Sequence, residues 1–178
     1  MSESRSTTLP AGAPIIKRCV FFVVLFLAGT GVHYLARPYL GPLFNRLLNA
    51  QVAAWVIAFV SPAEGVHASG SSVGAANTYV QVAQGCEGID VMLMLVAAIV
   101  AFPMTIRLKV VGSIAGALLI YVVNVSRIVA LWYCLRFWPS NFDSMHIIVG
   151  QTILVLVGVA YFAALARMRG GGLVQPSR

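Results

Sequence analysis

The sequence predicts an all-α membrane protein of about four transmembrane helices, with an interfacial helix and a short β-hairpin on its outer side. The 178 residues are 60% hydrophobic and only 10% charged, and their mean hydropathy is +0.89. Soluble domains are about half apolar and about a quarter charged. Several apolar runs along the chain have a length close to the roughly 20 residues that a helix needs to cross a bilayer. Short basic clusters flank these runs, as topology signals do.

We expect a single membrane domain over residues 15–169. Residues 1–14 are rich in Ser, Thr, Pro, Gly and Ala, and residues 170–178 open with three glycines. Such segments bury too little apolar surface to fold, so both ends are expected to be disordered and cytoplasmic. The first span is expected at about Ile16–Leu35. No small-residue cleavage site follows it, so we interpret it as a retained span rather than a signal peptide.

The next segment, Leu43–Val60, is open to two interpretations. Pro38 and Pro42 are expected to bracket a turn before it. Its first half carries several polar side chains, and only Val52–Val60 is continuously apolar. That run is too short to span, so we favour a helix on the outer surface. The alternative is a full second span, which would put later basic residues outside, against the positive-inside bias.

The long non-apolar stretch Ser61–Gly85 predicts a β-hairpin. Thr78–Gln84 alternates polar and apolar residues, which is typical of a strand. Val66–Ser69 is the expected partner, across a turn at Gly70–Gly74. Unpaired strand edges do not lie in lipid. The hairpin should therefore lie in water or against protein, just before Cys86.

Charge sets the expected topology. Further spans are expected at Ile89–Thr105, Val110–Phe137 and His146–Leu165, with a short loop at Pro139–Ser144. Basic residues lie beside the proposed inner ends: Lys17, Arg18, Arg107, Lys109, Arg167 and Arg169. Placing all of them in the cytoplasm makes four spans alternate consistently, with both termini inside.

Three residues from different spans can share one depth near the outer surface. Cys86 and His146 each open a span there. Arg127 lies nine residues before Arg136, which marks the outer end of its span. Its Cα is therefore about 13 Å deeper, and its long side chain can reach upward. Asn124 shares the helical face of Arg127 and could hold the guanidinium by hydrogen bonding.

These residue types suit acyl transfer. A cysteine thiolate attacks a carbonyl carbon, while a histidine takes or gives the proton. An arginine donates hydrogen bonds to the oxyanion or holds a substrate carboxylate. Glu87 and Asp90 lie beside Cys86, and we expect them to serve the substrate or to pair with Arg127.

Other classes of function are not indicated. The three cysteines are too few and too scattered for a disulfide framework or a zinc site. The chain has no Gly-rich phosphate loop, no His-Glu-x-x-His pattern and no serine nucleophile elbow. We therefore expect neither a metal nor another cofactor. The net charge of +7 lies in flanking clusters, so no nucleic-acid partner is expected.

Each site residue also has a structural interpretation. Cys86 could be a small packing residue, and His146 an ordinary interfacial histidine. A guanidinium within a span is costly and is usually functional or paired. Arg127 could therefore form a structural ion pair with Glu87 or Asp90.

Other residues and other functions compete with this site. Cys134 is a rival nucleophile on about the same helical face as Arg127, in a setting that indicates packing. His67 and Glu64 could reach the site from the outer loop. The alternative functions are a non-enzymatic membrane assembly factor and a small transporter with Arg127 in a polar path.

Three ordered motifs resemble those of the exosortase/archaeosortase family: Gly85–Asp90, Asn124–Ile128 and Phe142–His146. The resemblance covers about Leu43–Leu165 and is most similar to the exosortase H subgroup. It implies a bacterial inner-membrane cysteine protease or transpeptidase, with its active site and its β-hairpin facing the periplasm.

The resemblance also implies a substrate and residue roles. Exosortases cleave a C-terminal sorting signal from secreted proteins and pass the acyl group to an acceptor. For the exosortase H type the signal has an Ile-Pro-Thr-Leu-like motif followed by a transmembrane helix. Cys86 would be the nucleophile, Arg127 the essential arginine and His146 the third member. Glu87 departs from the Ser or Asn that often follows the family's cysteine.

Overall fold

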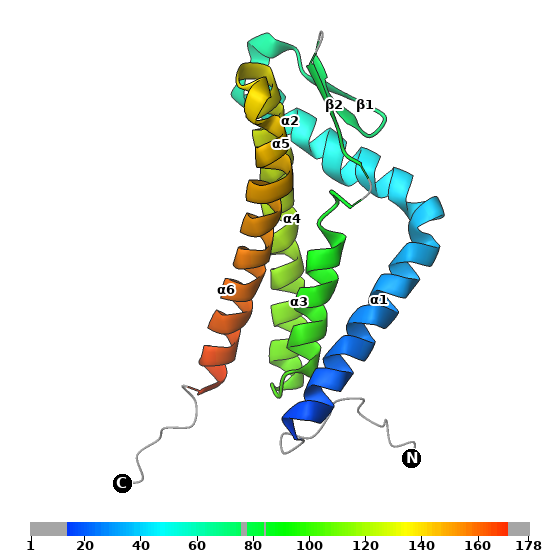
Figure 1. Cartoon of the computed structure of the whole chain (residues 1–178), viewed down its shortest axis with the longest axis vertical. Coiled ribbons are helices and arrows are strands. Elements are labelled where there is room, and N and C mark those ends of the chain that lie inside the picture. Colours follow the sequence, from blue (N-terminus) through cyan, green and yellow to red (C-terminus); the bar gives the residue numbers. More distant parts are fainter. Residues whose placement is uncertain (1–13, 76–77, 84, 171–178) are drawn as a thin grey trace.

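The computed structural model describes residues 14–75, 78–83 and 85–170. The predicted disordered ends lie almost entirely outside these ranges. Figure 1 shows the long helices running alongside one another, with a further helix and a small sheet gathered at one end. The longer helices are α1 (Ile15–Leu43), α2 (Gln51–Val60), α3 (Ile89–Ala101), α4 (Ile106–Phe137) and α6 (Gly150–Gly170), and α5 (Phe142–Ser144) is a short helical turn. The prediction of a mostly helical fold is thereby confirmed.

The turn predicted at Pro38 and Pro42 is wrong, because both prolines lie inside α1. A proline removes one helical hydrogen bond and costs about 3 kcal/mol in a helix interior, yet the chain stays helical. The change of direction comes just afterwards, in the π-helical segment Phe44–Ala50, and Figure 1 shows α2 running across the end of the bundle beyond it. Prolines and π-helical turns are the usual causes of such bends.

Helix α2 forms as predicted within Leu43–Val60 and covers the end of the bundle that carries the sheet. Its inner side buries Ala53, Ala54 and Ile57 against the sheet and α4. Its other side exposes Trp55 and Phe59, and aromatic side chains of this kind favour the membrane interface. Because no break separates α1 from α2, Ile15–Val60 is also one apolar stretch of spanning length.

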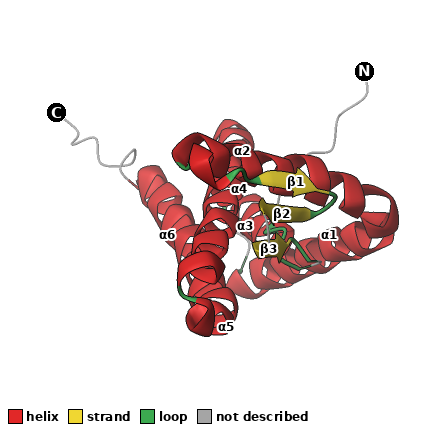
Figure 2. Ribbon diagram, turned by 90° about the horizontal axis from the view of Figure 1, so that it is seen from above, coloured by secondary structure: helices red, strands yellow, loops and turns green. Residues whose placement is uncertain are grey.

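The sheet has three antiparallel strands rather than the two predicted. Strand β1 (His67–Ser69) pairs with β2 (Ser72–Ala75), which pairs with β3 (Thr78–Gln81). The predicted direct pairing of the first and last strands is therefore wrong. The turn occupies only Gly70 and Ser71, so the rest of the expected turn becomes the central strand. Figure 2, seen from above, shows the sheet over the ends of the helices.

Helix α3 is shorter than the span predicted at Ile89–Thr105. It has 13 residues and ends at Ala101, because Pro103 disfavours a helical conformation for the residue before it. A helix of this length rises about 20 Å, which is less than the roughly 30 Å of a bilayer core. Among the described residues, three helical stretches are long and apolar enough to cross a membrane: Ile15–Val60, Ile106–Phe137 and Pro139–Met168.

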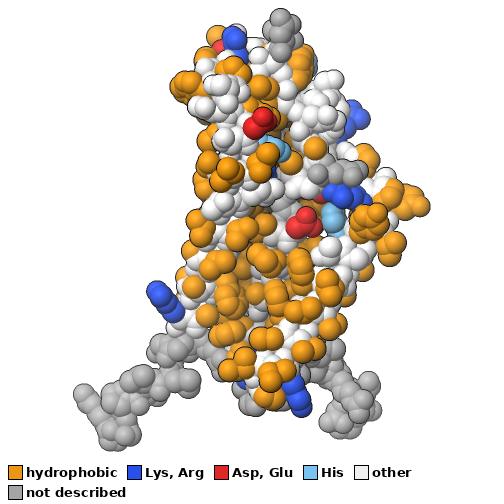
Figure 3. Space-filling view, in the orientation of Figure 1, with side chains coloured by type: hydrophobic (Ala, Val, Ile, Leu, Met, Phe, Trp, Pro, Cys, Tyr) orange, Lys and Arg blue, Asp and Glu red, His pale blue; other side chains and the backbone are white. Residues whose placement is uncertain are grey.

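The surface of the bundle is suited to lipid. Large hydrophobic side chains are exposed along α1, α4 and α6, including Leu27, Ile114 and Leu156. Figure 3 shows hydrophobic side chains covering most of one face of the lower bundle, while the visible Asp, Glu and His side chains lie in the upper half. The chain is thus a multi-pass membrane protein whose visible Asp, Glu and His side chains lie toward the end that carries the sheet.

Candidate active site

The thiol of Cys86 lies in a tight turn between β3 and α3. The Cys86 N–H donates a hydrogen bond to the carbonyl oxygen of Ala83 at 3.1 Å. Gly88 then caps α3 with φ of 76°, a backbone region that glycine adopts most readily. A Cβ added at Gly88 would come within 3.1 Å of the Asn124 side chain. The turn therefore docks closely against α4, which fixes where the thiol lies.

The imidazole of His146 faces that thiol. The Sγ atom of Cys86 lies 3.7 Å from Nε2 of His146, within the range of a hydrogen bond to sulfur. His146 belongs to a π-helical segment, Met145–Val149, and its ring stacks on Phe142 with centroids 5.8 Å apart. The predicted loop at Pro139–Ser144 is wrong in detail, because it is helical and continues through Met145–Val149 into α6. His146 thus lies within a helical stretch rather than at its start.

The guanidinium of Arg127 completes the cluster. Its Nη2 donates a hydrogen bond to the backbone carbonyl of His146 at 3.1 Å. The side chain is 8% exposed, and among the described residues it forms no ion pair. The structural alternative, a pair with Glu87 or Asp90, is therefore not found. Arg127 thus carries a buried positive charge, and no carboxylate of the described residues pairs with it.

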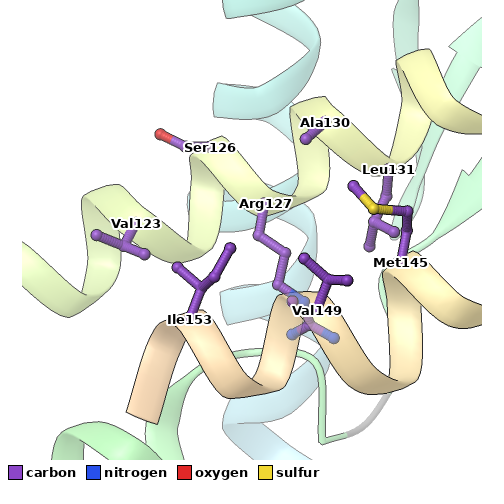
Figure 4. Close-up of a pocket in the computed structure, with 9 residues that line it drawn as sticks. Val123, Ser126, Arg127, Ala130, Leu131, Met145, Val149 and Ile153 are labelled. Atoms are coloured by element: carbon purple, nitrogen blue, oxygen red, sulfur yellow. The ribbon is translucent and has the colours of Figure 1, made fainter. Parts of the chain in front are cut away.

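One cavity of about 320 Å³ joins the three residues. Cys86, Arg127 and His146 all line it, together with β3 and part of α4. A second cavity, of about 210 Å³, lies between α4 and α6. Figure 4 shows Arg127 reaching across this second cavity from α4 toward the helix that carries Val149. Because Arg127 lines both cavities, it separates an apolar space within the bundle from the space that contains the thiol.

The supporting residues have partners that the sequence did not reveal. Asn124 donates to Oδ1 of Asn49 at 3.3 Å, and its amide oxygen accepts no hydrogen bond from Arg127 among the described residues. Glu87 is 2% exposed; it accepts a hydrogen bond from Asn45 at 3.0 Å and lies 3.6 Å from Nε2 of His33. Asn45 and Asn49 stood out only as polar positions in an apolar segment.

These contacts give Glu87 a role distinct from either expectation. Its partners come from α1 and the π-helical segment after it, so its carboxylate ties the turn of Cys86 to the N-terminal helices. Asp90 lies in the first turn of α3, where an acidic side chain suits the positive end of the helix dipole.

The rival residues lie elsewhere. Cys134 is buried, and its Sγ donates to the carbonyl of Trp138 at 3.7 Å. Glu64 pairs with Arg136 at 3.1 Å. His67 is exposed and contacts the carbonyl of Gly65. None of these three rival side chains lines the cavity of Cys86, which leaves Cys86 as the thiol beside an imidazole.

Gly150 offers a test of how Arg127 is positioned. A Cβ added at Gly150 would collide with Nε of Arg127 and lie 3.1 Å from the Met145 carbonyl. Gly150→Ala should therefore displace the guanidinium and lower the activity of the site by roughly 10²-fold, because small misplacements have effects of this size. Gly158→Ala on the same helix is the matched control, since its Cβ would meet only ordinary contacts of 3.6 and 3.7 Å. Equal activity of the two variants would contradict the positioning role.

The fold and the cavity together define an integral membrane protein with a thiol, an imidazole and a guanidinium in one space, the arrangement used in cysteine-dependent acyl transfer. The comparison with protein families is in agreement. The transmembrane exosortase model (Exosortase_EpsH) matches residues 6–163, and the chain belongs to this family. No curated protein and no solved structure matches the chain.

Membership confirms the resemblance predicted from the three motifs. Exosortases are membrane cysteine peptidases or transpeptidases that act on secreted proteins with C-terminal sorting signals. The matched range includes Cys86, Arg127 and His146. The family match alone assigns no role to these residues.

Proposed function

We propose that the chain is a membrane-embedded cysteine transpeptidase that cleaves a C-terminal sorting signal through an acyl-enzyme on Cys86. The observation that carries this proposal is the 3.7 Å distance between Sγ of Cys86 and Nε2 of His146, within a cavity that Arg127 also lines. A nucleophile within reach of a base is the basic requirement of covalent acyl transfer.

The reaction would run in two stages. His146 takes the thiol proton, the sulfur of Cys86 attacks the scissile carbonyl carbon, and a tetrahedral oxyanion forms. The C–N bond then breaks, and the leaving amine takes the proton from His146. In the second stage the nucleophile of an acceptor gives its proton to His146 and attacks the thioester, the C–S bond breaks, and the proton passes from His146 to the sulfur, which regenerates the thiol of Cys86.

Arg127 would stabilise the negative charge of this reaction. Its positive charge has no carboxylate partner among the described residues, and a buried guanidinium that lacks one is suited to an oxyanion or a substrate carboxylate. Its bond to the His146 carbonyl holds it beside the imidazole. The same bond keeps α4 and the π-helical segment in register at the cavity.

Family membership supports a proposal for the substrate and for the setting. We infer a secreted protein that ends in an Ile-Pro-Thr-Leu-like motif and a transmembrane helix, as in the exosortase H type. The positions of the basic clusters support placing Cys86 on the periplasmic side of a bacterial inner membrane. In this arrangement α2 lies at the outer interface, and α3 is a short fourth span packed among α1, α4 and α6.

A thioester search tests the proposal. Membranes that hold the protein and its substrate should contain a Cys86 peptide extended by the trimmed C-terminus of the substrate, measured by mass spectrometry. Hydroxylamine should remove the extension, because it cleaves thioesters. The Cys134 peptide in the same sample should be unmodified. Two results would refute an acyl-enzyme on Cys86. One is continued processing with the adduct on Cys134, and the other is continued processing while the Cys86 thiol can be fully alkylated throughout turnover.

A further inference from the structure

The cavity of Cys86 runs along an outer strand of the sheet. The strand order is β1-β2-β3, so within the described parts of the chain β3 pairs with β2 on one edge and with no strand on the other. Five consecutive residues, 79–83, line the cavity. Successive side chains of a strand point to opposite faces, so a cavity over one face would meet alternate residues. Contact with all five indicates that the cavity lies along the edge of the chain.

Among the described residues, the backbone groups on the outer side of β3 have no hydrogen-bond partner. The Val82 N–H donates to the carbonyl of Ser71 at 2.9 Å, and Val80 lies opposite Val73. Hydrogen-bonded and non-hydrogen-bonded positions alternate in an antiparallel pair. Val80 and Val82 therefore direct their N–H and C=O groups to β2, whereas Tyr79 and Gln81 direct theirs away from it. No described residue outside the sheet forms a hydrogen bond with the backbone of Tyr79 or Gln81.

A free strand edge beside a nucleophile is suited to an extended peptide. Unpaired backbone groups of an edge strand pair readily with another chain, and many peptide-binding domains use this mode. The chain leaves the strand after Gln81 and turns at Ala83 to place Cys86 in the same cavity. A peptide on this edge would bring a carbonyl carbon to the thiol.

We propose that the substrate binds as an added β-strand along the outer edge of β3. The inference rests on the proposed function and specifies how that site recognises its substrate. At about 3.3 Å per residue, residues 79–83 match an extended segment of four or five residues. The opposite wall is apolar, formed by Leu131, Leu135 and Phe142. The substrate side chain directed to this wall is therefore apolar.

Proline at position 81 isolates the backbone contribution. Gln81→Pro removes one outward N–H and leaves the pairing with β2 intact, since proline is tolerated at the outward positions of edge strands. We expect kcat/KM for the sorting-signal substrate to fall about tenfold, the effect of one lost hydrogen bond. Gln81→Ala keeps the N–H, so its kcat/KM should fall much less. Labelling of Cys86 by iodoacetamide in the same membranes reports whether the turn is intact.

Proline on the opposite edge is the matched control. His67 lies opposite Gly74 and Ser69 opposite Ser72, so by the same alternation Ala68 directs its N–H outward from β1. Ala68→Pro removes an equivalent N–H at an edge that does not line the cavity. This variant should keep its activity toward the substrate.

A second measurement uses the unaltered protein. Synthetic peptides that carry an Ile-Pro-Thr-Leu motif are N-methylated at one non-proline position at a time and tested as competitors of processing. Strand addition predicts that methylation weakens competition about tenfold at alternate positions and little between them.

The outcomes separate the two proposals. Equal activity of Gln81→Pro and Gln81→Ala with labelling retained, or a methylation scan without alternation, would overturn strand addition while leaving the acyl-enzyme standing. If Gln81→Pro also loses labelling, the methylation scan decides. Processing by Cys86→Ala would instead overturn the proposed function.

Discussion

Replacement of Cys86 by alanine should abolish cleavage of the sorting-signal substrate. The variant keeps the turn and the buried contacts but lacks the atom that forms the thioester. Loss of a nucleophile lowers turnover by roughly 10⁴-fold or more, so processing should be undetectable by gel shift of the substrate. The amount of the variant in the membrane should match that of the unaltered chain, as measured by immunoblot.

Two further variants sharpen this result. Cys86→Ser keeps the shape of the side chain, but a hydroxyl is a far weaker nucleophile than a thiolate at neutral pH, so processing should also be lost. Cys134→Ala removes a thiol that bonds to Trp138 outside the cavity, and it should still process substrate. If Cys134→Ala lost processing at normal protein levels while Cys86→Ala stayed active, Cys134 and not Cys86 would be the nucleophile.

The same variants distinguish the other function classes. A small transporter with Arg127 in a polar path would tolerate Cys86→Ala, because a thiol has no place in such a path. An assembly factor that only binds C-terminal helices would still bind its partner in the Cys86→Ala variant. It would leave that partner uncut both in the variant and in the unaltered protein. Cleavage that depends on Cys86 is therefore the result that the enzyme alone predicts.

Hydropathy and charge sufficed to predict most of the helices and the meeting of the three site residues. Cys86 and His146 were expected at one depth, and their side chains lie 3.7 Å apart. This part was predictable because the bilayer constrains depth: an apolar run of known length, with charges at its ends, fixes where its polar residues lie.

The bends and the polar contacts were not predictable in the same way. Prolines such as Pro38 and Pro42 usually mark a break, but here both lie inside the continuous helix α1. Strand β2 was not predicted because Ser72–Ala75 is a short segment of mostly small residues. Its pairing with a strand on each side depends on tertiary contacts. The partners of Glu87 come from residues 42 and 54 positions earlier, and no local pattern encodes such distant pairs.

Replacement of Arg127 by lysine should lower processing nearly as much as its replacement by alanine. Lysine keeps the positive charge, but its ammonium lacks the planar fork that donates to two acceptors at once. In the structure Nη2 is already bonded to the His146 carbonyl, so stabilisation of an oxyanion requires a second donor from the same group. Loss of one such donor costs about 10²–10³-fold in turnover.

The measurement should separate chemistry from folding. Single-turnover cleavage in membranes is expected to fall in both Arg127 variants while the amount of protein and the alkylation of Cys86 remain normal. Cleavage by Gly150→Ala should also fall, but by less than in the Arg127 variants, since this change displaces the guanidinium without removing it. Full activity of Arg127→Lys would show that a single positive charge is sufficient, and the role of Arg127 would then be electrostatic attraction of the substrate rather than paired hydrogen bonding at the reacting carbonyl.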